Sequence, residues 1–203
     1  MSDSGARGTV DPRRYREILG HFATGVTVVT TISTGPVAGG ADAVELDGQR
    51  SDAAEVHPWG TTVNAFSSVS LDPPLVLICI AHVRSIHPVI AASGRFAVNI
   101  LGEDDQLLSD CFAGAPSPYP RSAFCGASYH LGTTGVPILD SAIAYLDCEL
   151  ERSVDVGDHT IYIGRVVGLG SGIDHILPLL YYRGRYLRIE RAEERDLLGK
   201  PEL

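Results

Sequence analysis

Short stretches of β-branched and aliphatic residues, separated by turn-forming residues, dominate the hydrophobic pattern of this 203-residue chain. Residues 26–33 (VTVVTTIS) are β-branched almost throughout, which favours a strand. Pro73 and Pro74 precede a second apolar strand at 75–81. The same criteria predict further strands at 61–66, 96–101, 142–151, 159–168, 179–182 and 186–190. Strands therefore outnumber helices, and we expect a mainly β domain.

Three short helices are predicted beside these strands. The first covers 11–22, with Asp11 as its N-cap and Pro12 at its first position. The second covers 86–92 and stops at Gly94, and the third covers 104–112 and ends at Gly114. Strands spaced by turns, with few helices, favour a β-barrel with short flanking helices over an alternating α/β sheet.

The organisation along the chain is that of one domain. Residues 1–10 are small and polar and are expected to form a flexible arm, the domain covers 11–190, and 191–203 form a tail. A long insertion at about 35–58, rich in Gly, Ala, Asp and Glu, interrupts the domain, with one short strand or hairpin near 43–46. Loops of this length inside a compact domain are uncommon and often functional.

Charge and composition narrow the classes of partner. The chain is 44% hydrophobic and 20% charged, and its formal net charge is −9 without a basic run, which argues against nucleic acid and anionic membranes. Its longest apolar run, 75–81, is too short to span a bilayer, and residues 1–20 lack the apolar core of a secretory signal. The prediction is a cytoplasmic protein. The single lysine, Lys200, lies close to the C-terminus, which argues against lysine-based catalysis.

Cysteine and histidine spacing indicates no metal site. The four cysteines lie 32, 14 and 23 residues apart without a C-x-x-C pair, so we expect reduced, mostly buried thiols: Cys79, Cys111, Cys125 and Cys148. His82 and His87 are five residues apart across a predicted strand-to-helix junction, with no clustered His or carboxylate ligands in sequence.

Three further motifs have ordinary structural interpretations. The glycine-rich segment 168–172 (GLGSG) lacks the third glycine of a dinucleotide fingerprint, since position 173 is Ile, so a flexible turn is expected. Ser67, Ser68 and Ser70 lie outside any G-x-S-x-G motif and are expected in a polar turn. In the turn 155–160, Asp158 and His159 can exchange protons or hydrogen bonds, although spacing alone favours a capped turn with a surface histidine.

Taken together, several segments give a more specific signal. They are HFATGVTVVTT (21–31), GTTVNAFSSVSLDPPLVLICI (60–80), FAVNIL (96–101), GDHTIYIGRV (157–166) and PLLYYRGRY (178–186). In this order they resemble the flavin reductase-like family. The resemblance implies a six-stranded FMN-binding split β-barrel, a homodimer, and an NAD(P)H:flavin reductase that serves a two-component monooxygenase. It also implies FMN or FAD as the flavin, NADH or NADPH as co-substrate, and a flavin-dependent monooxygenase as partner.

The resemblance also assigns roles to individual positions. It places Asp158 and His159, in the intact G-D-H motif, as catalytic residues near the nicotinamide during hydride transfer to the flavin. The protein would contribute mainly ring positioning and exclusion of water. Residues expected to bind the flavin come from three segments: Thr61, Thr62, Val63, Asn64, Ala65, Ser67, Ser68, Cys79, Ile80, Ala81, Arg84 and Ser85.

Two segments depart from the family pattern. Val83 and Ile86 stand where hydroxyl side chains are expected to bind the flavin phosphate, so either Arg84, Ser85 and the following helix replace them or the phosphate site is lost. The insertion at 35–58 replaces a short turn and would cover the groove, alter the dimer or recruit a partner. Two other functions stay open: a repurposed split-barrel enzyme acting directly on a small molecule, with or without flavin, and a non-enzymatic flavin- or partner-binding module.

Overall fold

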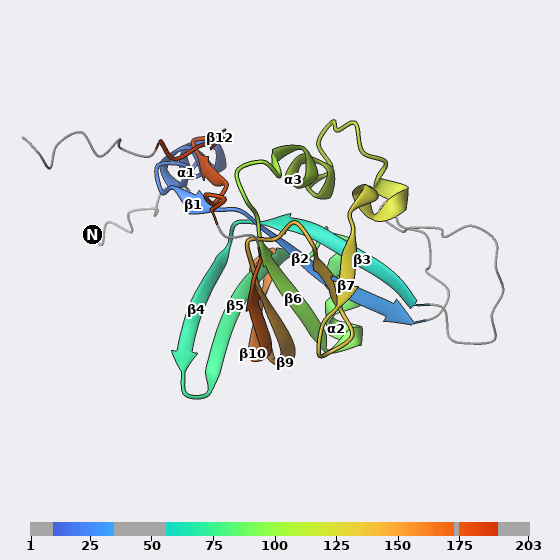
Figure 1. The fold of residues 1–203 in the computed structure, drawn as a ribbon. Coiled ribbons are helices and arrows are strands. Elements are labelled where there is room, and N and C mark those ends of the chain that lie inside the picture. Colours follow the sequence, from blue (N-terminus) through green and yellow to red (C-terminus); the bar gives the residue numbers. More distant parts are fainter. Residues whose placement is uncertain (1–9, 35–55, 173–174, 191–203) are drawn as a thin grey trace, which may run out of the picture.

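The computed structural model describes residues 10–34, 56–172 and 175–190, and strands dominate them (Figure 1). The helices are α1 (Pro12–Leu19), α2 (Ile86–Ser93), α3 (Gln106–Ala113) and the 3-10 helix η1 (Arg121–Gly126). The longer strands are β2 (Thr27–Thr34), β3 (Val56–Val63), β4 (Phe66–Leu71), β5 (Pro74–Ala81), β6 (Arg95–Ile100), β9 (Ala144–Val156) and β10 (His159–Ser171). The short ones are β1 (Thr24–Gly25), β7 (Tyr129–Leu131), β8 (Pro137–Leu139), β11 (Leu180–Tyr182) and β12 (Arg185–Leu187). The mainly β prediction is confirmed.

One antiparallel sheet forms the centre of the fold. Within the described residues it has seven strands in the order β3-β2-β6-β9-β10-β5-β4. Its two edge strands, β3 and β4, are consecutive in the chain and are separated only by Asn64 and Ala65, so the sheet curls until its edges meet at this corner. There the Cys79 amide donates a hydrogen bond to the Ala65 carbonyl, with N and O 3.0 Å apart. The ladder is not closed, so the six-stranded barrel stays a prediction.

The core lies inside the curled sheet. Apolar residues that alternate along the strands point inward and meet the buried face of α2, where Ile86 and Ile90 are 2% and 0% exposed. A second apolar cluster lies between α3, η1 and the start of β2. No helix in the described part of the chain is long and apolar enough to cross a membrane.

The helix ends follow the predicted signals. The Asp11 carboxylate accepts a hydrogen bond from the Arg13 amide, and Pro12 opens α1. Both α2 and α3 end at glycines in the left-handed conformation, Gly94 and Gly114. Asp11 and Pro12 thus mark where α1 begins, and the two glycines mark where α2 and α3 end.

Several local predictions were wrong. Residues 168–171 are not a flexible turn but the end of β10, paired with β9 as far as Ser171 opposite Ala144. Ser67, Ser68 and Ser70 belong to β4 rather than to a turn. The insertion is shorter than expected on its C-terminal side, because β3 already begins at Val56. The strand or hairpin expected near 43–46 lies outside the described residues, as do most of the arm and the tail.

The prediction of four reduced thiols was also wrong. Cys111 of α3 and Cys125 of η1 form a disulfide, whereas Cys79 and Cys148 are free. Spacing along the chain gave no sign of this pair because tertiary folding brings η1 back onto α3. Both bonded cysteines are buried in the cluster beneath α3, so the expectation of burial holds for them.

Candidate functional site

A cavity of about 190 Å³ lies where the two sheet edges meet. It is lined by segments that are distant in sequence: the end of β3, the corner after it, the end of β5, the loop that follows β5, and the start of β10. We call it the His159 cavity. Its lining residues are Thr61, Thr62, Val63, Asn64, Ala65, Cys79, Ile80, Ala81, Arg84 and His159. All ten are among the residues predicted for the site.

Strand pairing fixes the walls of this cavity. The ends of β5 and β10 are aligned in antiparallel register, so that Ala81 lies opposite His159 and Cys79 opposite Ile161. On the facing wall, Thr62 donates a hydrogen bond from Oγ1 to the carbonyl of Ser109 in α3, with the two oxygens 2.6 Å apart. Asn64 and Ala65 are exposed at the corner. Strand pairing on one side and the hydrogen bond to α3 on the other therefore hold the lining of the cavity in place.

The G-D-H turn joins β9 to β10 at one side of the cavity. Gly157 adopts φ +61°, the left-handed conformation that favours glycine. The His159 Nδ1 atom lies 2.7 Å from Asp158 Oδ1, and this hydrogen bond holds the pKa of Asp158 below its usual value. Because the Asp158 carboxylate accepts a hydrogen bond from Nδ1, the other ring nitrogen of His159, Nε2, remains available to a ligand. His159 thus lines the cavity, and Asp158 orients its ring.

Arg84 is the cationic side chain at the mouth of the cavity, beyond the end of β5. Its guanidinium Nη1 donates to the carbonyl of Ala113, 3.2 Å away, at the end of α3. Val83 and Ile86, the two positions that depart from the family pattern, lie in different surroundings. Ile86 is 2% exposed and packs in the core of the sheet, whereas the Val83 side chain is 92% exposed.

The structure does not bring four predicted residues into this cavity. Ser67 instead lines a neighbouring apolar groove, and Ser68 lies exposed on β4. Ser85 is the N-cap residue of α2, without a hydrogen bond from its side chain to the helix backbone. Asp158 stays outside as the partner of His159. Ser67 and Ser68 are neighbours on β4, so their side chains point to opposite faces of the strand and neither enters the cavity. Ser85 lies at the start of α2, beyond the cavity lining.

Two further hollows adjoin the His159 cavity, and sequence reasoning did not predict them. A hollow of about 180 Å³, the tyrosine cavity, is lined by Val26, Thr62, Asn64, Ala113, Tyr181 and Tyr186. A larger apolar groove of about 790 Å³ is lined by residues of α1, β1 and the β4–β5 hairpin together with Asn64, Ala65 and Cys79. Asn64 lines all three, so the corner after β3 is a wall that the three hollows share. The tyrosines of the segment YYRGRY, two of which line the tyrosine cavity, were the sequence feature that could have indicated it.

One cysteine, Cys79, lines the cavity. Partial burial raises the pKa of the Cys79 thiol, which keeps it protonated at neutral pH. The chemistry available at this site is therefore positioning and hydrogen bonding.

Comparisons with known proteins agree with this geometry. Residues 19–190 match the family model described as "Flavin reductase like domain". The chain is 38% identical over 185 residues to the reductase subunit HsaB of a flavin-dependent monooxygenase from Rhodococcus jostii, covering 91% of this chain and 82% of that protein. It is 36% identical over 193 residues to an NADH-dependent flavin reductase from a Rhodococcus species, covering 95% and 92% of the two chains.

Solved structures show the same fold. The NADH:FAD oxidoreductase SgcE6 of Streptomyces globisporus, solved in complex with NAD and FAD fragments, superimposes with a TM-score of 0.69 at 32% identity. This match covers 93% of the present chain and 99% of that one. The family model covers most of the chain, and the three named relatives are covered to 82%, 92% and 99% of their own length. The chain therefore belongs to the flavin reductase-like domain family.

Proposed function

We propose that this protein is an NADH-dependent flavin reductase that supplies reduced FMN or FAD to a partner monooxygenase. One observation carries the proposal: ten residues expected at the flavin and nicotinamide from sequence alone line a single cavity, although they come from separate segments. The two named Rhodococcus relatives, a monooxygenase reductase subunit and an NADH-dependent flavin reductase, support the same activity.

The residues at the cavity fit a flavin. A flat heteroaromatic ring needs hydrogen-bond donors and acceptors along its edge, and the backbone groups of 61–65 and 79–81 at the cavity can provide them. Arg84 at the mouth offers a guanidinium for the ribityl phosphate. The His159 cavity alone is smaller than the ~300 Å³ at the lower end of typical ligand sites, so the adjoining hollows would hold the rest of the two ligands.

The bound flavin supplies the hydride-accepting chemistry, and the protein supplies the arrangement around it. Asp158 fixes the ring of His159 through Nδ1, so that Nε2 can hydrogen-bond the nicotinamide carboxamide. The Thr62 side chain is already bound to α3, which limits movement of the opposite wall. Such fixed positioning lowers the entropy cost of bringing the two ligands into the reactive orientation.

His159→Ala tests this arrangement. Losing the ring is expected to lower kcat/KM for NADH by roughly tenfold to a hundredfold, the effect of misplacing one reactant, and to leave flavin affinity nearly unchanged. His130→Ala is the matched control, because His130 also pairs with a neighbouring carboxylate, Asp140, at 2.8 Å, and is absent from the lining of the His159 cavity. If His159→Ala instead abolishes flavin binding, the residue serves the flavin or the fold.

We further propose that the protein is a homodimer formed across the apolar groove. Phe22 and Leu19 line this groove with 77% and 53% of their surfaces exposed, and the neighbouring hairpin β4–β5 projects from one side of the fold with Leu71 at its tip (Figure 1). Large exposed apolar patches of this kind mark interaction surfaces. Light scattering should give the mass of two chains for the unmodified protein and of one for Phe22→Asp. Leu131→Asp, which changes an exposed leucine on β7, should stay dimeric.

A further inference from the structure

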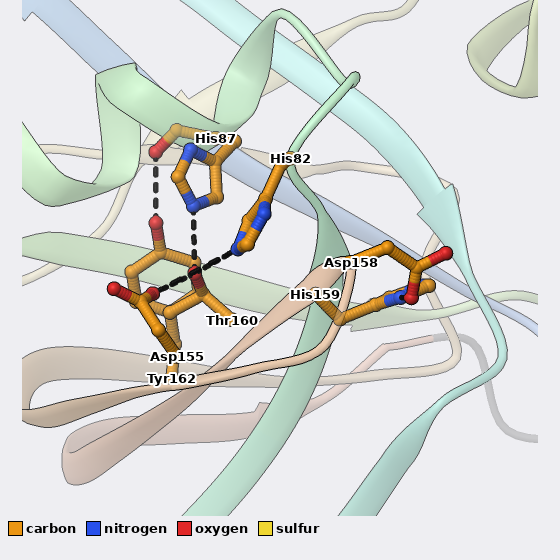
Figure 2. A network of polar contacts seen from close by, with 7 residues as sticks. All are labelled: His82, His87, Asp155, Asp158, His159, Thr160 and Tyr162. Carbon is orange, nitrogen blue, oxygen red and sulfur yellow. Dashed lines mark hydrogen bonds and ion pairs between the residues drawn. The ribbon is translucent and has the colours of Figure 1, made fainter.

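Two histidines and a carboxylate come together beside the G-D-H turn, on the other side of the β10 start from His159 (Figure 2). His82 comes from the loop after β5, His87 from the first turn of α2, and Asp155 from the end of β9. One potential ligand atom from each lies within 4.8 Å of the other two. We call these three residues the His82 cluster.

All three side chains point at the hydroxyl of Thr160, the second residue of β10 (Figure 2). Thr160 Oγ1 lies 2.6 Å from Asp155 Oδ1, 2.8 Å from His87 Nε2 and 3.1 Å from His82 Nε2. The hydroxyl has one proton and uses it to donate a hydrogen bond to the carboxylate. Both imidazoles must therefore donate to the hydroxyl oxygen from Nε2. Three ligand atoms from three separate elements are thus aimed at nearly one point.

One spacing within the cluster is close to that of a metal centre. In a tetrahedral zinc site, with bonds of about 2.1 Å, ligand atoms are about 3.4 Å apart. His82 Nε2 and Asp155 Oδ1 are 3.8 Å apart. Asp155 and His82 have side chains that are 82% and 40% exposed, which leaves them room to close the remaining gap.

The surroundings hold the histidines in place. Tyr162 is buried, its ring lies 5.7 Å from that of His87, and its hydroxyl donates to the His87 carbonyl at 2.9 Å. The His82 amide donates to the Asp158 carbonyl at 3.0 Å. Burial, and secondarily the neighbouring His82, lowers the pKa of His87, which favours the neutral imidazole that metal ions require.

We propose that His82 Nε2, His87 Nε2 and an oxygen of Asp155 bind a divalent transition-metal ion of the Zn²⁺ type, with water in the fourth position. On binding, each neutral ring moves its proton from Nε2 to Nδ1 through solvent, and Thr160 keeps its hydrogen bond to the carboxylate. No net proton is released by the two rings. Spacing along the chain predicted no metal site, because Asp155 comes close to the two histidines only through the pairing of β5 with β10.

The ion would join three elements around one side of the His159 cavity. It would tie the loop after β5 and the start of α2 to the β9–β10 hairpin that carries Asp158 and His159. Since an ion bound only by the folded state stabilises that state, the melting temperature should rise with free Zn²⁺ concentration. This site does not depend on the flavin chemistry proposed above.

Binding of Zn²⁺ and Co²⁺ to the full chain, made without a polyhistidine tag and stripped of metal with EDTA, tests the proposal. Calorimetry should show one Zn²⁺ per chain at about pH 7.5, with weaker binding at lower pH because protons compete with the ion for its ligands. Co²⁺ should give visible absorption without a thiolate charge-transfer band, because the cluster contains no cysteine.

Variants decide where the ion binds. His87→Gln and His82→Gln should each weaken binding at least tenfold, and should remove the Zn²⁺-dependent rise in melting temperature. His130→Ala, which removes a histidine from an exposed His–Asp pair outside the cluster, should bind like the unmodified chain. The proposal is wrong if the unmodified chain binds no stoichiometric Zn²⁺, or if both glutamine variants, shown to be folded by circular dichroism, bind it as tightly.

Discussion

Replacing Gly164 with alanine tests the packing that holds β10, the strand that begins with His159. Gly164 lies between Val76 of β5 and Leu150 of β9, next to a shift in the β9–β10 register. A Cβ atom at this position would lie 2.5 Å from Phe96 Cζ and 2.9 Å from Cys148 Cβ. Both neighbours are 0% exposed, so neither side chain can turn away into solvent.

The size of the effect follows from this crowding. Inserting one carbon into a well-packed core costs about 1–3 kcal/mol. For a domain of this length, each kcal/mol lowers the melting temperature by roughly 2–4 °C. Gly164→Ala should therefore lower it by roughly 2–12 °C. Because Phe96 and Cys148 lie in the core that supports β10, NADH turnover should also fall.

Urea and thermal unfolding, followed by circular dichroism at one fixed protein concentration, measure this cost. Gly25→Ala is the matched control, since a Cβ there meets no atom within 4 Å. It should change the free energy of unfolding by less than about 0.5 kcal/mol. The reasoning is refuted if Gly164→Ala unfolds like the unmodified protein, or if Gly25→Ala is equally destabilised.

Two further predictions concern the cavity and the thiols. Arg84→Ala should weaken FMN binding and spare riboflavin, which lacks the phosphate, in a fluorescence titration; equal losses for both would remove Arg84 from a phosphate-binding role. Burial, with a smaller contribution from the charge of Asp147, raises the pKa of Cys148 to about 12. At pH 8 only ~10⁻⁴ of this thiol is ionised, against about a quarter of an ordinary one. In the folded chain, alkylation monitored by mass spectrometry should leave Cys148 unmodified and modify Cys79 slowly. The modification of Cys79 should be slower still when flavin is present. Rapid modification of Cys148, or no protection of Cys79 by flavin, would contradict the assigned positions.

The sequence predicted the strands best where local composition and tertiary structure agree. Segment 26–33 is β-branched, and its structure is β2, buried over most of its length. Asp11, Pro12, Gly94 and Gly114 marked helix ends correctly because capping depends on nearby atoms.

The wrong predictions concern residues whose role depends on distant parts of the chain. Gly168 and Gly170 suggested a turn, yet they lie in β10 against Thr133 and Tyr145, where a Cβ would come within 2.9 and 2.6 Å. Local composition does not contain this information, since the neighbours are 35 and 25 residues away in sequence. The Cys111–Cys125 disulfide was missed for the same reason.

The candidate site was predicted by resemblance more than by physical pattern. None of residues 61–65 and 79–81 has a side chain that by itself indicates a ligand-binding site. From spacing alone, Asp158 and His159 were most simply interpreted as a capped turn. Pairing of β5 with β10 brings His159 beside Ala81 and creates the cavity. The same pairing assembles the His82 cluster, which no spacing along the chain indicated.

The most direct test of the central claim is an anaerobic assay of NADH oxidation by the purified full chain with FMN or FAD in excess. The account predicts that NADH is consumed one for one with flavin reduced, and that His159→Ala slows this reaction while His130→Ala does not. A folded protein that binds neither flavin, or that binds flavin without oxidising NADH, would contradict it.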